Sequence, residues 1–303
     1  MELVAGSCVF ISVRSSSDPG IAVLRPRMRI WRKAGIGLGA LVALGLGLYA
    51  SGAMAAVSLE LRAETTRSST VEDEEIPSYY RRVPDVRASA DDEPEASDTA
   101  LPEPANRATR KILELKDSIY ESLTDTQYQH RTVIRRDEGV YRWDCSGMVA
   151  WFLRKTAPKA RKALDKKRPV ARDFYRAIAK APTNRARNGW RRLPHIEDVR
   201  PGDMFAWKRP PGFPSRNTGH TGFALEPPRK VPGLPGAYTL RILDATSLPH
   251  QDDTRTREDG GGIGEGTIMF MVDETGRGTA YGWHGARSRW VIVTDIVFGR
   301  VSR

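Results

Sequence analysis

Apolar positions recur with a helical period in three segments of the chain. The first segment covers residues 107–123 and would form an amphipathic helix. Its apolar face is made of Ile112, Leu115, Ile119 and Leu123. The second segment begins at Cys145 and stops near Pro158, and the third covers residues 171–181 and ends at Pro182. Because proline disrupts a continuing helix, the last two segments have clear ends, and the pattern as a whole predicts three helices.

Short apolar runs bounded by turn residues follow the helices and predict strands. They cover residues 204–207, 221–225, 238–243, 268–272, 279–283 and 291–298. A Pro-Gly-Asp turn at 201–203 precedes the first run, and a turn at 273–276 predicts a hairpin. The glycine-rich stretch 260–266 is predicted to be a flexible loop. Helices followed by an antiparallel meander favour an α+β domain, with N-terminal helices packed on an antiparallel β-sheet.

Charge divides the chain into three parts. Residues 1–55 carry a net charge of +4, residues 56–105 carry −8 and residues 106–303 carry +15. The middle part holds five prolines and few aliphatic residues, so it cannot bury enough apolar surface to offset its ordering entropy. We therefore expect a disordered linker over 56–105 and one folded domain over 106–303. A domain with that charge should bind anionic polymers.

The N-terminal part has the pattern of a secretory signal peptide. A basic segment starting at Met28 precedes an uncharged stretch, and small residues then allow cleavage after Ala55. Met28 is the expected start of the protein. The uncharged residues 34–57 are also long enough to act as an uncleaved membrane anchor. Both alternatives place the remainder outside the cytoplasm, in the periplasm or cell envelope, because the basic residues precede the apolar stretch.

The clearest chemical signal is the sequence Asp144-Cys145-Ser146-Gly147 at the start of the second predicted helix. Asp is a favourable N-cap, which places Cys145 in the first turn. There the unpaired N–H groups and the positive end of the helix dipole favour the thiolate, the nucleophilic form of cysteine. Cleavage of the signal peptide would remove Cys8 and leave Cys145 as the sole thiol. We therefore interpret Cys145 as a candidate nucleophile.

A nucleophilic thiolate needs a base, and histidine is the usual choice near neutral pH. Among the five histidines, His220 lies between glycines and precedes an apolar run that would form a rigid strand. Asp244 ends a later apolar run and would orient the imidazole. Asp244 could instead cap the following turn, and His250 is the rival for the third position.

These motifs, in this order, resemble the NlpC-type cell-wall cysteine peptidases. The resemblance covers about residues 107–300 and includes Asp-Cys-Ser-Gly at a helix start, a Pro-Gly-Asp turn and Gly-His-Thr-Gly. It implies a papain-like cysteine peptidase fold with Cys145 as nucleophile and His220 as base. The family usually has His, Asn or Gln as its third residue, where this chain has Asp244.

The resemblance further implies hydrolysis of amide bonds in peptidoglycan stem peptides through an acyl-enzyme, with no cofactor or metal. The Pro- and Gly-rich insert 209–219 is expected near the cleft mouth, and Tyr141 either lines the cleft or packs in the core. The alternatives are a transglutaminase-like or other amidase with the same triad, and a catalytically dead cell-wall-binding module. Nucleic acid is not an expected partner, because no helix-turn-helix or zinc spacing is present.

Overall fold

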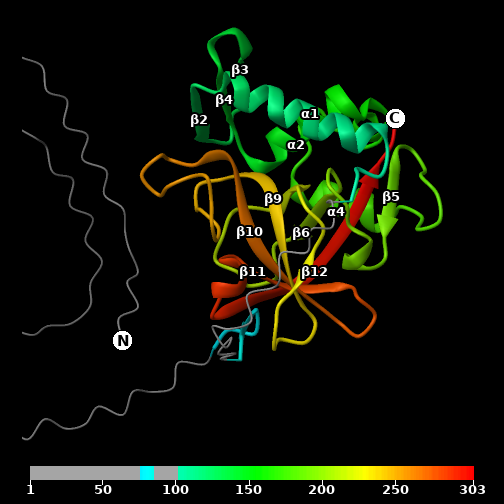
Figure 1. Cartoon of the computed structure of the whole chain (residues 1–303), viewed down its shortest axis with the longest axis vertical. Coiled ribbons are helices and arrows are strands. Elements are labelled where there is room, and N and C mark those ends of the chain that lie inside the picture. The colour runs from blue at the N-terminus through cyan, green and yellow to red at the C-terminus, as the bar shows by residue number, and fades with distance from the viewer. Residues whose placement is uncertain (1–75, 85–101) are drawn as a thin grey trace, which may run out of the picture. The chain divides into compact units, whose positions relative to one another are not determined.

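Six antiparallel strands close into a barrel, as seen in the computed structural model, which describes residues 76–84 and 102–303 (Figure 1). The ring order is β6 (Met204–Lys208), β7 (Gly219–Ala224), β9 (Ala237–Thr246), β10 (Gly262–Val272), β11 (Gly278–Gly282) and β12 (Trp290–Val301). The ring closes because β12 pairs with β11 along its first part and with β6 at residues 297–299.

The expected papain-like α+β fold, with helices packed on an antiparallel sheet, is wrong. The predicted strands are present, but alternation of apolar residues does not reveal whether the first and last strands of a meander meet. Here the 12-residue β12 is long enough to pair with two different neighbours. At the closing edge, Arg300 Nη2 on β12 lies 2.7 Å from Oδ2 of the buried Asp203, the residue before β6. This ion pair ties the two strands together.

All three predicted helices are present, and their bounds are close to the expected ones. They are α1 (Arg107–Ser122), α2 (Cys145–Thr156) and α4 (Ala171–Ala179), with the short α3 (Pro158–Lys162) after α2. Asn106 caps α1 by accepting the backbone N–H groups of Ala108 and Thr109. Ile112 and Ile119 are buried, as the apolar face predicted.

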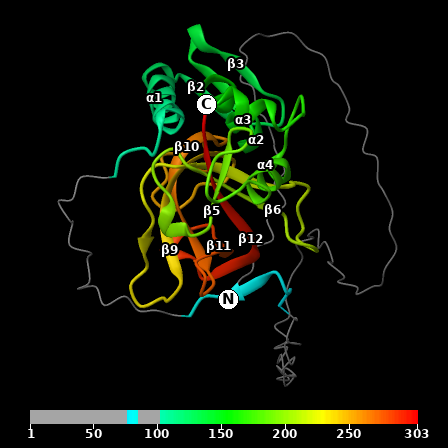
Figure 2. The same ribbon diagram turned by 90° about the vertical axis from the view of Figure 1, so that its right-hand side faces the viewer.

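A small second sheet, which the sequence did not predict, lies between α1 and α2 in chain order. It contains β2 (Asp125–Tyr128), β3 (Val133–Arg135) and β4 (Val140–Trp143), with β4 in the middle. Figures 1 and 2 both show this sheet together with α1 and α2 at one end of the barrel. Two further short strands extend the barrel sheet, β5 (Trp190–Leu193) beside β12 and β8 (Arg229–Lys230) beside β9.

The core has two main parts, one inside the barrel and one between the barrel and the helices. Aromatic side chains fill the interior, where Phe205, Phe270 and Phe298 are buried and contact one another in sequence. Outside, Phe152 of α2 packs against Phe223 of β7 with ring centroids 5.3 Å apart. This contact fixes α2, and with it Cys145, against the strand that carries His220.

Within the predicted linker, β1 (Tyr80–Arg82) pairs with β12, a strand that the linker prediction did not include. Two adjacent tyrosines explain it, since Tyr79 and Tyr80 pack against Phe213 with centroids 5.3 and 6.3 Å away. The predicted signal segment 1–55 and most of the linker lie outside the described residues. In the described ranges, no helix combines the length and apolar character that crossing a bilayer requires.

Candidate active site

Cys145 is the first residue of α2, as predicted. The Asp144 carboxylate caps the helix by accepting the backbone N–H of Gly147 at 2.7 Å. Asp144 Oδ2 also lies 3.1 Å from Nη2 of Arg168, which anchors the cap to the surrounding chain. Cys145 is only 6% exposed, and its Sγ lies 3.7 Å from Oγ of Ser146. The thiol therefore sits in a sheltered helix start.

His220 is carried on β7, so the prediction that it lies on a strand is confirmed. The preceding Gly219 has φ of +134°, and a Cβ there would collide with the backbone oxygen of Trp207 on β6. Glycine therefore permits the close approach of the two strands. His220 pairs in register with Trp207, and their rings are 5.1 Å apart. The imidazole is held between the strands and the ring of Trp283, 5.4 Å away.

Asp244 reaches His220 because β7 and β9 are neighbours in the barrel. His220 Nε2–H donates to Asp244 Oδ2 at 2.6 Å. The carboxylate is fully buried. With Nε2 engaged, Nδ1 is the ring nitrogen left to face Cys145. The structure thus brings Cys145, His220 and Asp244 together from a helix and two strands.

The charges of this cluster shift two pKa values in opposite directions. Burial alone would lower the pKa of His220, but the Cys145 thiolate and its hydrogen bond, together with Asp244, raise it to about 10. Burial alone would raise the pKa of Asp244, but Arg255, His250 and His220 hold it well below its usual value. The favoured state at neutral pH is therefore an imidazolium next to a carboxylate.

His250 and Arg255 contact the same carboxylate. His250 Nε2–H donates to Asp244 Oδ2 at 2.8 Å, and Arg255 Nη2 lies 2.8 Å from Oδ1. His250 was the rival of Asp244 for the third position, yet its ring centroid is 6.5 Å from that of His220. Asp244 is therefore the residue bonded to His220, and His250 lies behind it. Arg255 was not predicted, because no local pattern links it to Asp244.

The same cluster has the spacing of a metal site, which the sequence did not lead us to expect. Ligand atoms of His220, Asp244 and His250 all lie within 4.8 Å of one another. However, the Arg255 guanidinium already pairs with Asp244, so a divalent cation would sit beside a buried fixed positive charge. These donors fit a hydrogen-bonded carboxylate better than a metal ion.

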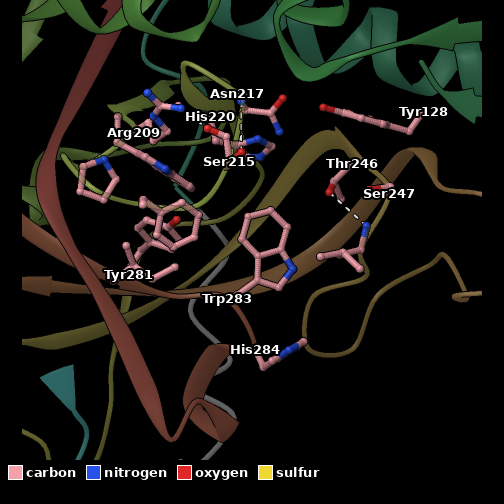
Figure 3. Close-up of a pocket in the computed structure, with 16 residues that line it drawn as sticks. Tyr128, Arg209, Ser215, Asn217, His220, Thr246, Ser247, Tyr281, Trp283 and His284 are labelled. Carbon is pink, nitrogen blue, oxygen red and sulfur yellow. Dashed lines mark hydrogen bonds between the residues drawn. The ribbon is translucent and has the colours of Figure 1, made fainter. Parts of the chain in front are cut away.

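A pocket of about 380 Å³ opens beside His220 (Figure 3). Its wall is largely aromatic, and Trp207 and Tyr281 stack in it with centroids 4.2 Å apart. Arg209 is the only lining residue with a permanent charge. The 209–219 insert supplies several lining residues, which confirms its predicted place at the cleft. The aliphatic part of the wall comes from Leu248 and Ile292.

Tyr128 lines this pocket together with Tyr281, whereas Tyr141 does not. Tyr141 is 2% exposed and packs against Trp143, so its role is in the core. Burial, and then the negative charges of Cys145 and Asp144, raise the pKa of Tyr128 above its usual value. Its hydroxyl therefore keeps its proton near the thiol. Sequence reasoning missed Tyr128 because the small sheet that carries it was not predicted.

Comparison with known proteins gives one informative relative. Uncharacterized protein R653 of Acanthamoeba polyphaga mimivirus is 32% identical over 180 residues, which cover 52% of this chain and 77% of the viral protein. The chain belongs to the same family as this viral protein. No protein-family model matches the chain. No solved structure matches it either.

Proposed function

We propose that the chain is a cysteine peptidase or amidase that hydrolyses amide bonds with Cys145, His220 and Asp244. The observation that carries the proposal is the 2.6 Å hydrogen bond between His220 Nε2 and buried Asp244, which leaves Nδ1 for Cys145. The Cys145 thiolate attacks the amide carbonyl, and His220 protonates the departing amine. Water then releases the acyl group from the sulfur with His220 as base.

Two groups could donate hydrogen bonds to the negative charge that develops on the carbonyl oxygen. The backbone N–H of Cys145 lies in the first turn of α2, where N–H groups lack partners within the helix. The Tyr128 hydroxyl is the second, because its raised pKa keeps it protonated next to the thiolate. Both donors come from elements at the same end of the barrel.

Peptidoglycan stem peptides are the first proposed substrate. The resemblance to NlpC-type peptidases supports them, as does the net charge of +15 on residues 106–303, which would attract a polymer bearing free carboxylates. Export through the N-terminal segment, with cleavage after Ala55 or a tether at 34–57, would place the enzyme in the cell envelope where this polymer is found.

An amide with a bulky apolar group is the second candidate substrate, because the pocket beside His220 favours it. An aromatic and aliphatic wall gains more free energy from burying a large apolar group than from the small side chain of alanine. Arg209 at this pocket would pair with a carboxylate on the same molecule. Both candidates use the same cysteine chemistry.

The test is hydrolysis by the purified full chain beside its Cys145→Ala variant. Peptidoglycan and a panel of acyl amides, with groups from alanyl to phenylalanyl, are incubated at neutral pH with a reductant, and products are identified by mass. Release of stem-peptide fragments only with the intact thiol supports the first substrate, and a rate that rises with apolar size supports the second. Transfer of the acyl group to added amines would indicate the transglutaminase-like alternative. Absence of any turnover would contradict the proposal in favour of a dead binding module.

A further inference from the structure

The glycines of β10 leave one face of this strand without side chains. The flexible loop predicted over 260–266 is wrong from Gly262 onward, because β10 begins there. Gly264 and Gly266 lie two residues apart, so both face the same side. A Cβ at Gly266 would lie 2.5 Å from Oδ2 of Asp253 and 2.7 Å from Cβ of His250. A Cβ at Gly264 would collide with the side chain of Arg255. The strand thus makes room for three polar side chains.

Those side chains form a buried cluster behind Asp244. Arg255 Nη2 pairs with Asp244 Oδ1 at 2.8 Å, while its Nε donates to Asp253 Oδ1 at 2.7 Å. Arg255 Nη1 donates to the carbonyl oxygen of Gly262 at 2.9 Å. The backbone N–H of His250 donates to Asp253 Oδ2 at 2.7 Å. Asp253 therefore orients the Arg255 guanidinium and fixes the backbone of His250.

The hydrogen bonds of His250 require a proton on each ring nitrogen. Nε2 lies 2.8 Å from the Asp244 carboxylate, and Nδ1 lies 3.0 Å from the carbonyl oxygen of Trp283. Both partners only accept hydrogen bonds, so both nitrogens donate. The His250 side chain is fully buried. Two cations and two carboxylates thus balance in the cluster, and Cys145 and His220 remain the pair that exchanges a proton.

Building on the proposed function, we propose that His250 and Arg255 are positioning residues that hold Asp244 in one orientation and share its negative charge. His220 then keeps Nδ1 turned toward Cys145 and releases its proton to the leaving group more readily than beside an unshared carboxylate. The geometry supports this, because His250 shares Oδ2 of Asp244 with His220, while Arg255 pairs with the other oxygen, Oδ1. An Asp244 without these partners would be free to turn and would attract the imidazolium proton with its full charge.

Other charged groups facing His220 are few among the described residues. Cys145 approaches from α2 and Asp244 from β9. The β6 neighbour Trp207 and the residue after β11, Trp283, are neutral aromatic rings. Removing the Arg255 cation should therefore act on His220 mainly through this carboxylate, whereas removing His250 also removes a charge whose ring lies 6.5 Å from that of His220.

The test follows the His220 ring by nuclear magnetic resonance in the Cys145→Ala protein, where no thiolate contributes and no turnover is needed. The chain has five histidines, and a His220→Gln variant assigns the signal. His250→Gln should raise the titration midpoint of His220 by about one pH unit, and Arg255→Met should do the same. Arg255→Lys is the matched control, because it keeps the charge at nearly the same length and should leave the midpoint unchanged.

Equal midpoints in the Arg255→Met and Arg255→Lys proteins, or a midpoint that falls in His250→Gln, would overturn the charge-sharing role. If the protein does not fold with a substitution at His250, the Arg255 variants test the charge-sharing role, and the reverse also holds. The result is separate from the proposed function, which fails if Cys145 in the otherwise native chain shows no turnover and no enhanced reactivity. The inference can fail while that reactivity is present.

Discussion

The two halves of the candidate site differ in how the chain builds them. Cys145 owes its environment to neighbours in sequence, since its cap Asp144 and the capped Gly147 lie within three residues. The environment of His220 comes from distant segments, because Asp244 and the cluster behind it are joined only when the barrel strands pair. A locally built nucleophile should tolerate changes elsewhere, whereas the base depends on the whole buried network.

The sharpest contrast concerns the thiol itself. Cys145→Ala should lower kcat/KM on an accepted amide by about 10⁴-fold or more, because the attacking thiolate is lost. The free energy of unfolding should fall by only about 1–2 kcal/mol, because His220 loses the thiolate but keeps the Asp244 carboxylate. Hydrolysis assays and urea unfolding measure the two quantities, with Ser146→Ala as the control. Residual turnover near that of the control would contradict the assignment.

Asp144 and Asp244 allow a matched comparison, because Asp144 caps the helix of Cys145 and Asp244 belongs to the buried network around His220. Asp244→Asn should lower kcat/KM by about 10³- to 10⁴-fold through loss of the imidazole orientation. It should also lower the free energy of unfolding by about 3–5 kcal/mol, because His250 loses its buried counter-charge and Arg255 keeps only Asp253.

The same change at Asp144 should be mild, because Asn caps a helix about as well as Asp. Urea unfolding of Asp144→Asn and Asp244→Asn therefore compares the two regions directly. Equal losses of stability would remove the distinction between them.

The pH dependence of kcat/KM tests the protonation of His220. kcat/KM should fall about tenfold per pH unit above about 10, because His220 must carry a proton to give to the leaving amine. A raised folded pKa also means that His220 contributes stability that is fully present below its unfolded pKa of about 6.5. That stability is lost as the pH rises through about 10. A basic limb near pH 6.5 would show that the thiolate and Asp244 do not hold the proton.

The smallest expected effect tests the bare face of β10. Gly264→Ala should lower the free energy of unfolding by about 1–3 kcal/mol, because the added methyl group would collide with Arg255. Thr267→Ala is the control, since that half-buried residue lies on the opposite face of the same strand. Thermal unfolding of both variants gives the comparison, and equal losses would argue against the space-making role.

The sequence predicted what depends on local patterns. The three helices, the cap at Asp144 and the existence of the main strands are confirmed, because periodicity and capping act over a few residues. Closure of the barrel was missed, since the pairing of β12 with β6 is set by strand length and bending rather than by alternation. Arg255 and Tyr128 were missed for the same reason, as their contacts with the site are entirely non-local.

Alkylation of Cys145 by iodoacetamide reports whether the thiol is paired with His220. A Cys8→Ser background leaves Cys145 as the only thiol, and its alkylation rate is measured from pH 5 to 10 with and without His220→Ala. Because the imidazolium of His220 stabilises the thiolate, Cys145 should be alkylated at pH 7 at least about tenfold faster with His220 present than in the His220→Ala protein. Equal rates at pH 7 in the two proteins would contradict a thiolate–imidazolium pair and, with it, the proposed enzyme.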